Sequence, residues 1–182
     1  MKHICTFLCL LLLSGVGQVD AFSEADLEKL KSTNECNKCD FSRANLGGAR
    51  LRGANLAEAN LTNAYLTGAN LYKANLEVVN LTGANLTGAN LTGANLEDTN
   101  LQEASLAGVD LTKAYLEATD LTGANLTMAN LTGAFLEGTN LENADLTDAV
   151  LTDATLNWVK NLNKAILCRT TMPDATVDNS GC

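Results

Sequence analysis

The stretch Ala84-Asn85-Leu86-Thr87-Gly88 is repeated at once as Ala89-Asn90-Leu91-Thr92-Gly93, and this period of five residues decides the fold. Outward from it, a large apolar residue recurs at every fifth position from Phe41 to Leu156, which makes 24 consecutive pentads. Two positions before each of them stands a small residue, which is alanine in 18 pentads. Neither the period of a helix nor a sustained two-residue alternation fits this pattern, so long helices and ordinary strands both describe it poorly.

Each pentad predicts a short extended segment followed by a corner. Residues two apart in an extended segment point the same way, so the alanine and the leucine face one side and the residue between them faces the other. That middle residue is usually polar, as at Asn85 and Asp110. The remaining two positions are often Thr-Gly, and glycine permits the positive φ that a type II turn requires.

Substitutions within the repeat indicate how many pentads close one coil. Departures from the alanine recur at intervals of twenty residues, and so does a glutamate two residues before each of them. They are Val79, Thr99, Thr119 and Thr139, together with Glu77, Glu97, Glu117 and Glu137. Four pentads per coil would stack each set in a column, so the 24 pentads predict six square coils, about 29 Å long in all. Four columns of leucine with alanine between them would fill the interior, which agrees with an aromatic content of only 4%.

The pentad A-(N/D)-L-x-x resembles the repeat of the pentapeptide-repeat family, and the resemblance covers about two thirds of the chain. It implies an all-β solenoid, a right-handed quadrilateral β-helix with leucine and the small residue inside. The resemblance and the number of repeats together predict a β-helix of about six coils, with short helical caps at both ends. The segments 166–174 and 180–182 are similar to the tails of exported bacterial and thylakoid-lumen members of the family.

The N-terminal residues predict an export signal. Lys2 and His3 precede an uncharged apolar run from Ile4 to Val16, and Val19-Asp20-Ala21 offers small residues for a signal peptidase. We therefore expect an exported protein, periplasmic or secreted, or lumenal in the thylakoid if the source is photosynthetic. Cleavage after residue 21 would leave 20 acidic and 11 basic residues, a net charge of −9, with no membrane anchor and no histidine.

The chain is expected to divide into a signal peptide at 1–21, an N-terminal capping helix at 22–38, the repeat domain at 39–158 and a C-terminal cap at 159–182. Ser23 and Asp26 fit the start of a capping box, with Phe22 stapled onto Leu27. The C-terminal residues with helical spacing are Trp158, Val159, Leu162, Ile166 and Leu167. Because caps cover the open strand edges of a solenoid, we expect a monomer or a weak dimer.

Four cysteines remain after signal removal, and an even count in an exported chain favours disulfides. Cys168 and Cys182 would close a loop of 15 residues, which stabilises by about 3 kcal/mol. Cys36 and Cys39 have three interpretations: a structural disulfide, a redox pair, or metal ligands. The structural interpretation is favoured because Cys39 takes an inward position and the helix precedes the pair. Four cysteines allow three pairings, and a rod favours joining neighbours at each end.

Two exposed features are candidates for binding. The glutamates at 77, 97, 117 and 137 form either a solvated acidic face or a site for a divalent cation or a basic partner. Tyr115 and Phe135 would be stacked neighbours that point outward and form a contact patch.

The composition favours a non-catalytic function. Once the signal is removed no imidazole remains for a catalytic pair, so no catalytic residue and no cofactor is expected. The acidic balance argues against nucleic-acid binding. The leading hypothesis is an exported, non-enzymatic scaffold that binds an unknown protein. The resemblance suggests one alternative, an acidic rod that mimics DNA and binds a nucleic-acid-handling enzyme. The other alternative is a redox or cation-binding protein that uses Cys36 and Cys39 or the glutamates.

Overall fold

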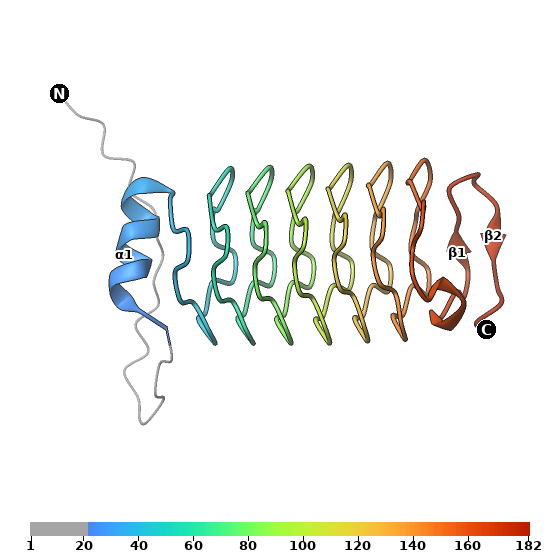
Figure 1. Ribbon diagram of the computed structural model, residues 1–182, viewed down its shortest axis with the longest axis horizontal. Coiled ribbons are helices and arrows are strands. Elements are labelled where there is room, and N and C mark those ends of the chain that lie inside the picture. The colour runs from blue at the N-terminus through green and yellow to red at the C-terminus, as the bar shows by residue number, and fades with distance from the viewer. Residues whose placement is uncertain (1–21) are drawn as a thin grey trace.

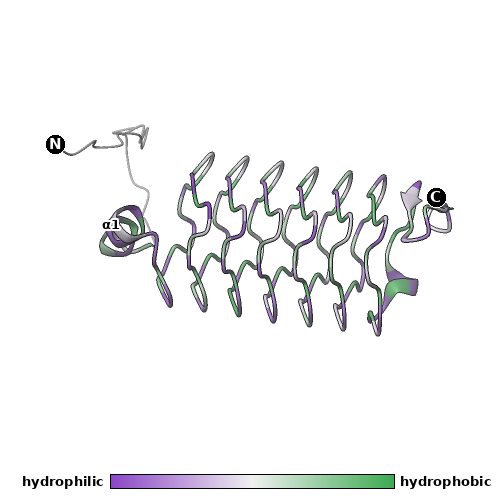
Figure 2. Cartoon of the chain, turned by 90° about the horizontal axis from the view of Figure 1, so that it is seen from above, coloured by the Kyte–Doolittle hydropathy of each residue, from purple (hydrophilic) through white to green (hydrophobic). Residues whose placement is uncertain are grey.

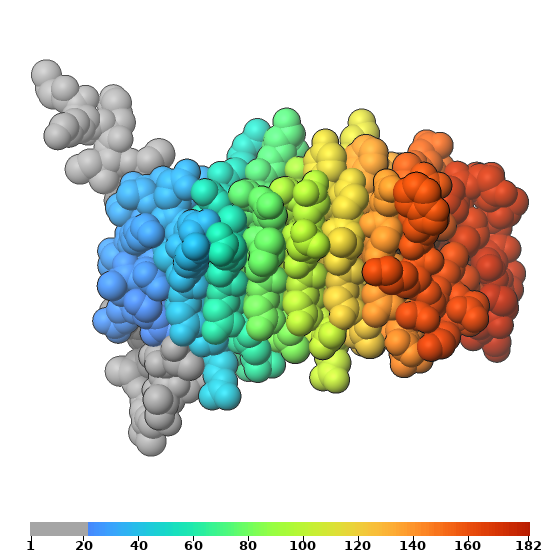
Figure 3. Space-filling model, viewed as in Figure 1, coloured from blue at the N-terminus to red at the C-terminus, as the bar shows by residue number. Residues whose placement is uncertain are grey.

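The computed structural model describes residues 22–182, and the predicted signal peptide at 1–21 lies outside the described residues. These residues form a straight rod, with the helix α1 (Glu24–Thr33) at one end and the short strands β1 (Thr170–Thr171) and β2 (Val177–Asp178) at the other (Figure 1). The space-filling view shows the coils as parallel rings of side chains along the rod (Figure 3). Within the described part of the chain, no helix is long and apolar enough to cross a membrane.

Parallel backbone pairing joins each coil to the next, and it follows the twenty-residue period that the sequence predicts. The paired residues form four columns along the rod, so the chain is a β-helix with four sides per coil. The first three columns join residues 35, 55, 75, 95, 115, 135 and 155; residues 40, 60, 80, 100, 120, 140 and 160; and residues 45, 65, 85, 105, 125, 145 and 166. The fourth joins residues 50, 70, 90, 110, 130, 150 and 171.

Every backbone N–H of the pentad at 84–88 has an acceptor, which explains why the repeat tolerates so little change. Asn85 donates back to Ala64, while Leu86 and Gly88 donate forward to the next coil, at N···O distances of 2.7 to 2.9 Å. The amide of residue 84 closes the preceding corner onto the carbonyl of residue 81. The fifth N–H, that of Thr87, donates to the side-chain oxygen of Asn85 over 3.0 Å. Backbone groups that are shielded from water must be paired. The asparagine side chain therefore has a structural role, because it accepts the one N–H of the pentad that no backbone carbonyl accepts.

The core follows the predicted inward positions. The leucines and alanines of the central coils are almost fully buried, and Figure 2 shows hydrophobic and hydrophilic segments alternating within each coil. Three buried threonines replace alanine in one column, and their hydroxyls donate to leucine carbonyls of the preceding coil over 2.6 to 2.7 Å. They are Thr99, Thr119 and Thr139. A polar side chain is accepted in this core because its hydroxyl is satisfied by the ladder.

The second corner position has a positive φ throughout the rod, as the Thr-Gly pairs predict. Gly88 has a φ of 64°, and non-glycine residues adopt the same conformation in other pentads. Val78 is the least suited of these because its φ is 58° and β-branched residues resist the left-handed region.

We therefore expect Val78→Gly to raise the free energy of unfolding by about 0.5–1 kcal/mol, because glycine removes the strain at a small entropic cost. Thermal unfolding measures the change. Gly88→Val is the matched control, since the space around its missing Cβ is open and a loss there reports backbone strain alone. A Val78→Gly protein no more stable than wild type would contradict the expectation.

The N-terminal cap covers the first coil with α1. The Ser23 hydroxyl caps the helix by accepting from the Asp26 N–H over 3.2 Å. A carboxylate oxygen of Asp26 accepts from the backbone N–H of Asp40 over 2.9 Å, which ties the helix to the rod. Leu30 is buried, and Leu27 packs against the core. The helix lies within the region 22–38 where the sequence predicts one, and pairing between coils already begins at residue 35.

The C-terminal cap is not the helix that its apolar spacing predicts, and this expectation is wrong. The chain makes one turn of 3-10 helix, η1 (Leu162–Lys164), and then continues the coil into β1 and its antiparallel partner β2. Pairing with the preceding coil persists, but Ile166 and Thr171 lie 21 residues beyond their partners, so this corner holds one extra residue. The exposed strand edge of the previous coil outweighs local helical spacing because it satisfies more backbone groups. Trp158, which the helical spacing includes, instead takes the second corner position of the last pentad and is 80% exposed.

The last residues lie directly against the final coil. The N–H of Gly181 donates to the Leu167 carbonyl over 2.9 Å, and Cys182 is bonded to Cys168. A Cβ at residue 181 would lie 2.5 Å from the backbone nitrogen of Leu167, closer than atoms can approach.

We expect Gly181→Ala to destabilise the C-terminal cap by about 2 kcal/mol, since the backbone must move away to make room. Hydrogen exchange of amides 166–171 measures this local loss. Asn163→Ala, which alters an exposed side chain of the same cap, is the control and should leave exchange unchanged. Unaltered protection in Gly181→Ala would show that the tail does not hold the cap.

Candidate interaction surface

One face of the rod carries the exposed aromatic pair. The outward residues of one column, at positions 55, 75, 95, 115, 135 and 155, form this face, called here the aromatic wall. Most of these positions hold asparagine or threonine, but Tyr115 and Phe135 occupy two successive coils. Their ring centroids are 5.0 Å apart and the planes differ by 10°, so they stack as the twenty-residue period predicts. Tyr115 is 43% exposed and Phe135 is partly buried, so solvent reaches both rings.

The glutamate column, Glu77, Glu97, Glu117 and Glu137, runs along the corner that follows the aromatic wall. Each of them stands two residues after a residue of the wall, in the same pentad. No ion pair within residues 22–182 includes any of the four. The Oε2 atom of Glu117 is buried and has no hydrogen-bond partner among the described residues.

The pKa of Glu117 depends on its burial and on the glutamates of the adjoining coils. Burial raises the pKa of its carboxyl above the ordinary value, and the like charges of Glu97 and Glu137 raise it further. Since its pKa in the folded state exceeds that of the unfolded chain, the folded state binds the proton more tightly. Stability therefore falls as the pH rises from 4.5 through the pKa of the folded state.

Accordingly, Glu117→Gln is expected to stabilise the protein at pH 7 by about a few tenths of a kcal/mol, because solvent screens a partly exposed group. Wild type should also gain stability as the pH falls from 7 toward 4.5, and the variant should gain less. Urea unfolding at several pH values measures both. An identical pH dependence in the two proteins would contradict the account.

Two aspartates on other faces behave in the opposite way. Burial by itself would raise the pKa of Asp110 and Asp120, but hydrogen bonds from neighbouring side chains and backbone N–H groups outweigh it and hold both pKa values low. Asp120 accepts from Thr122 over 2.6 Å and from Gln102 over 2.7 Å. Their contribution is present above pH 3.8 and is lost only as the pH falls further, so it leaves the window around Glu117 undisturbed.

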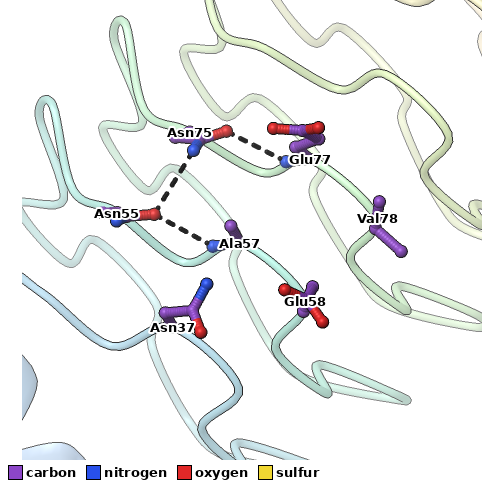
Figure 4. A pocket seen from close by; sticks show the side chains of 7 residues that line it. All are labelled: Asn37, Asn55, Ala57, Glu58, Asn75, Glu77 and Val78. Carbon is purple, nitrogen blue, oxygen red and sulfur yellow. Dashed lines mark hydrogen bonds between the residues drawn. The ribbon is translucent and has the colours of Figure 1, made fainter.

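A shallow hollow of about 290 Å³ lies on the same side of the rod, near its N-terminal end. Ala57 lines it, at the position where later coils carry a glutamate. Its lining residues are Asn37, Asn55, Ala57, Glu58, Asn75, Glu77 and Val78 (Figure 4). Asn75 donates to Asn55 over 3.3 Å, and Glu58 pairs with Lys38 over 3.3 Å, so much of the polar lining is already engaged.

The cysteines form two disulfides, one at each end of the rod. Cys36 is bonded to Cys39, and both are buried beneath α1; Cys168 is bonded to Cys182 near the surface. The sulfurs of Cys36 and Cys39 lie within 4.8 Å of the Asp26 carboxylate, a grouping that would suit a metal only if the thiols were free. As a disulfide the pair has no thiolate, which is the form that binds metals or attacks as a nucleophile.

Charge is distributed unevenly along the rod. Residues 22–75 contain six acidic and seven basic residues, whereas residues 76–182 contain fourteen acidic and four basic ones. In the N-terminal part, the Arg52 guanidinium lies over the ring of Tyr72, 4.2 Å from its centroid. This contact was not predicted from the sequence, although the two residues are twenty apart and the period places them in adjacent coils.

Comparison with known proteins gives matches that span the repeat. The family described as pentapeptide repeats matches in eight copies over residues 39–77, 59–98, 80–117, 99–138 and 129–160. No curated protein matches the chain.

Three solved structures illustrate what the chain is similar to. HetL, a pentapeptide repeat protein involved in heterocyst differentiation regulation from the cyanobacterium Nostoc sp. strain PCC 7120, is 31% identical over 79% of this chain and 78% of its own, with a TM-score of 0.30. A pentapeptide repeat protein of the Arabidopsis thaliana thylakoid lumen is 30% identical over 68% and 72%, with a TM-score of 0.44. QnrB1, a plasmid-mediated fluoroquinolone resistance protein, is 20% identical over 79% and 78%, with a TM-score of 0.43.

Proposed function

Since the chain belongs to the pentapeptide repeat family, we propose that it is an exported, non-enzymatic scaffold whose outer walls bind a partner protein. We further propose that the rod is right-handed, with about six regular coils between its caps. The proposal rests on one observation above others: the inward side chains and most asparagines serve stacking, while the exposed residues of the walls differ from coil to coil. Exposed residues that vary on a constant framework can recognise a partner without catalysing a reaction.

Export is supported by the predicted signal and by the cysteines. Disulfides persist in oxidising compartments and are rare in the cytosol. Each disulfide joins two residues that are close in sequence, Cys36–Cys39 at the N-terminal end of the rod and Cys168–Cys182 at the C-terminal end. Each bond therefore stabilises the cap at its own end.

A DNA-mimicking rod is the second candidate, favoured by the elongated shape and the net charge of −9. Against it stands the charge distribution, because residues 22–75 carry a slight positive excess and duplex DNA is uniformly negative along its length.

Fractionation combined with cross-linking in intact cells tests the proposal. The processed protein should be found outside the cytoplasm. Its mass should correspond to a chain that begins at residue 22, with all four remaining cysteines oxidised. Photo-cross-linkers on the outer walls should capture a discrete partner. An uncleaved, reduced protein in the cytosol would contradict the scaffold role and favour the second candidate.

A further inference from the structure

We propose that the aromatic wall binds an arginine-bearing segment of a partner protein, with a guanidinium stacked on the Tyr115–Phe135 pair and held by Glu117 and Glu137. This inference deepens the proposed scaffold function and rests on it. It gives the partner a defined chemistry: planar cationic side chains on an exposed segment.

The aromatic stack is open at both of its ends. Asn95 precedes Tyr115 in the column and Thr155 follows Phe135, and both are short side chains. Successive coils lie roughly 4.8 Å apart, a distance at which planar groups can stack offset on one another. A planar group from outside can therefore continue the stack above Phe135 without displacing a bulky neighbour.

The rod itself shows that this spacing accommodates arginine on an aromatic ring. Arg52 and Tyr72 stand in adjacent coils, and the guanidinium lies 4.2 Å from the ring centroid. Arg52 and Tyr72 occupy a corner column, whereas on the aromatic wall the position that follows Phe135 is Thr155, which is not a cation. Arginine suits the position better than lysine because its flat, weakly hydrated guanidinium both stacks and pairs with carboxylates.

The carboxylates beside the stack lack partners of their own. Glu117 and Glu137 stand two residues after Tyr115 and Phe135, at the adjoining corner. Neither belongs to an ion pair within residues 22–182, and Glu117 keeps an unpartnered buried oxygen. A guanidinium at the stack would approach the exposed part of these two carboxylates and separate their like charges. The acidic excess of residues 76–182 would draw a basic segment toward this part of the rod.

Trp158 extends the same region toward the C-terminal end. The residue before it, Asn157, accepts a hydrogen bond from the Gly138 N–H over 3.1 Å, so Trp158 lies one coil beyond the corner of Glu137. It is 80% exposed and is the one tryptophan of the sequence. Its fluorescence therefore reports occupancy of the neighbouring wall.

A capped hexa-arginine peptide serves as the probe, with binding to the oxidised protein followed by Trp158 fluorescence and by amide chemical shifts. We expect shifts concentrated at residues 95–98, 115–118 and 135–138. Binding should weaken by about tenfold or more in Tyr115→Asn/Phe135→Asn and in Glu117→Gln/Glu137→Gln. Asparagine occupies the equivalent positions 75 and 95 of the same column, so the aromatic variant preserves the repeat.

Matched controls separate the site from general attraction between opposite charges. Tyr65→Asn removes an equally outward tyrosine from another column and should change the affinity by less than about twofold. A hexa-citrulline peptide, equal in shape but uncharged, should not bind, and hexa-lysine should bind more weakly than hexa-arginine.

Three outcomes would overturn the inference: no binding of hexa-arginine, equal binding by the aromatic variant, or shifts spread over every acidic residue. Competition by calcium at stoichiometric amounts would also overturn it, by showing that the glutamate column is a cation site. Each of these would leave the scaffold function standing if cross-linking captures a partner elsewhere on the rod. Failure of the scaffold proposal shows instead as a cytosolic, unprocessed protein.

Discussion

Replacing Leu106 with alanine is expected to lower the free energy of unfolding by about 3 kcal/mol. The side chain is fully buried in the middle of the rod, between Leu86 and Leu126 of the adjoining coils. Removing it forfeits its burial and leaves a cavity, because the hydrogen-bonded coils on either side cannot collapse inward. Denaturant unfolding followed by circular dichroism measures the loss.

Thr67→Ala is the control for this change. It alters an exposed corner side chain and should shift stability by less than about 0.5 kcal/mol. A Leu106→Ala protein as stable as the control would mean that leucine does not fill a packed interior, and the fold description would fail with it.

Removal of the Cys168–Cys182 disulfide is the second large change. The double variant Cys168→Ser/Cys182→Ser is expected to lose about 3 kcal/mol, because the bond closes a loop of 15 residues and restricts the unfolded chain. The loss should appear first as fraying of β1 and β2, since the C-terminal cap holds the last strand edge.

The other disulfide gives a matched comparison. Cys36 and Cys39 are three residues apart, so the same relation predicts a smaller loss of about 2 kcal/mol on their removal. Hydrogen exchange locates each loss at its own end of the rod. Exchange that rises equally along the whole rod in the Cys168→Ser/Cys182→Ser protein would contradict the local role of this bond.

The sequence predicts most of this architecture because the repeat carries its own geometry. Spacing of leucine and alanine two apart places both inside, and exceptions such as Thr119 and Glu117 reveal the twenty-residue coil. The stacking of Tyr115 on Phe135 follows directly from that period, and the structure confirms it. The same arithmetic would have found Arg52 over Tyr72 had it been applied to charged residues.

Other features depend on contacts that periodicity does not encode. The capping of corner amides by Asn85 and its equivalents arises from side-chain geometry within one pentad, which a pattern of polarity does not specify. The C-terminal helix was wrongly predicted because Leu162 and Ile166 are spaced as on a helix, while an unpaired strand edge beside them decides the conformation. The unpartnered oxygen of Glu117 depends on burial and appears only in three dimensions.

The distance between spin labels at Thr67 and Thr147 tests the central description most directly. The two residues lie eighty apart in sequence but in one column of the β-helix, four coils apart. Pulsed dipolar spectroscopy on the oxidised protein should give a narrow distribution centred at about 19 Å, which is four layers of parallel strands. A broad distribution, or one centred beyond about 30 Å, would contradict a coil that closes every twenty residues.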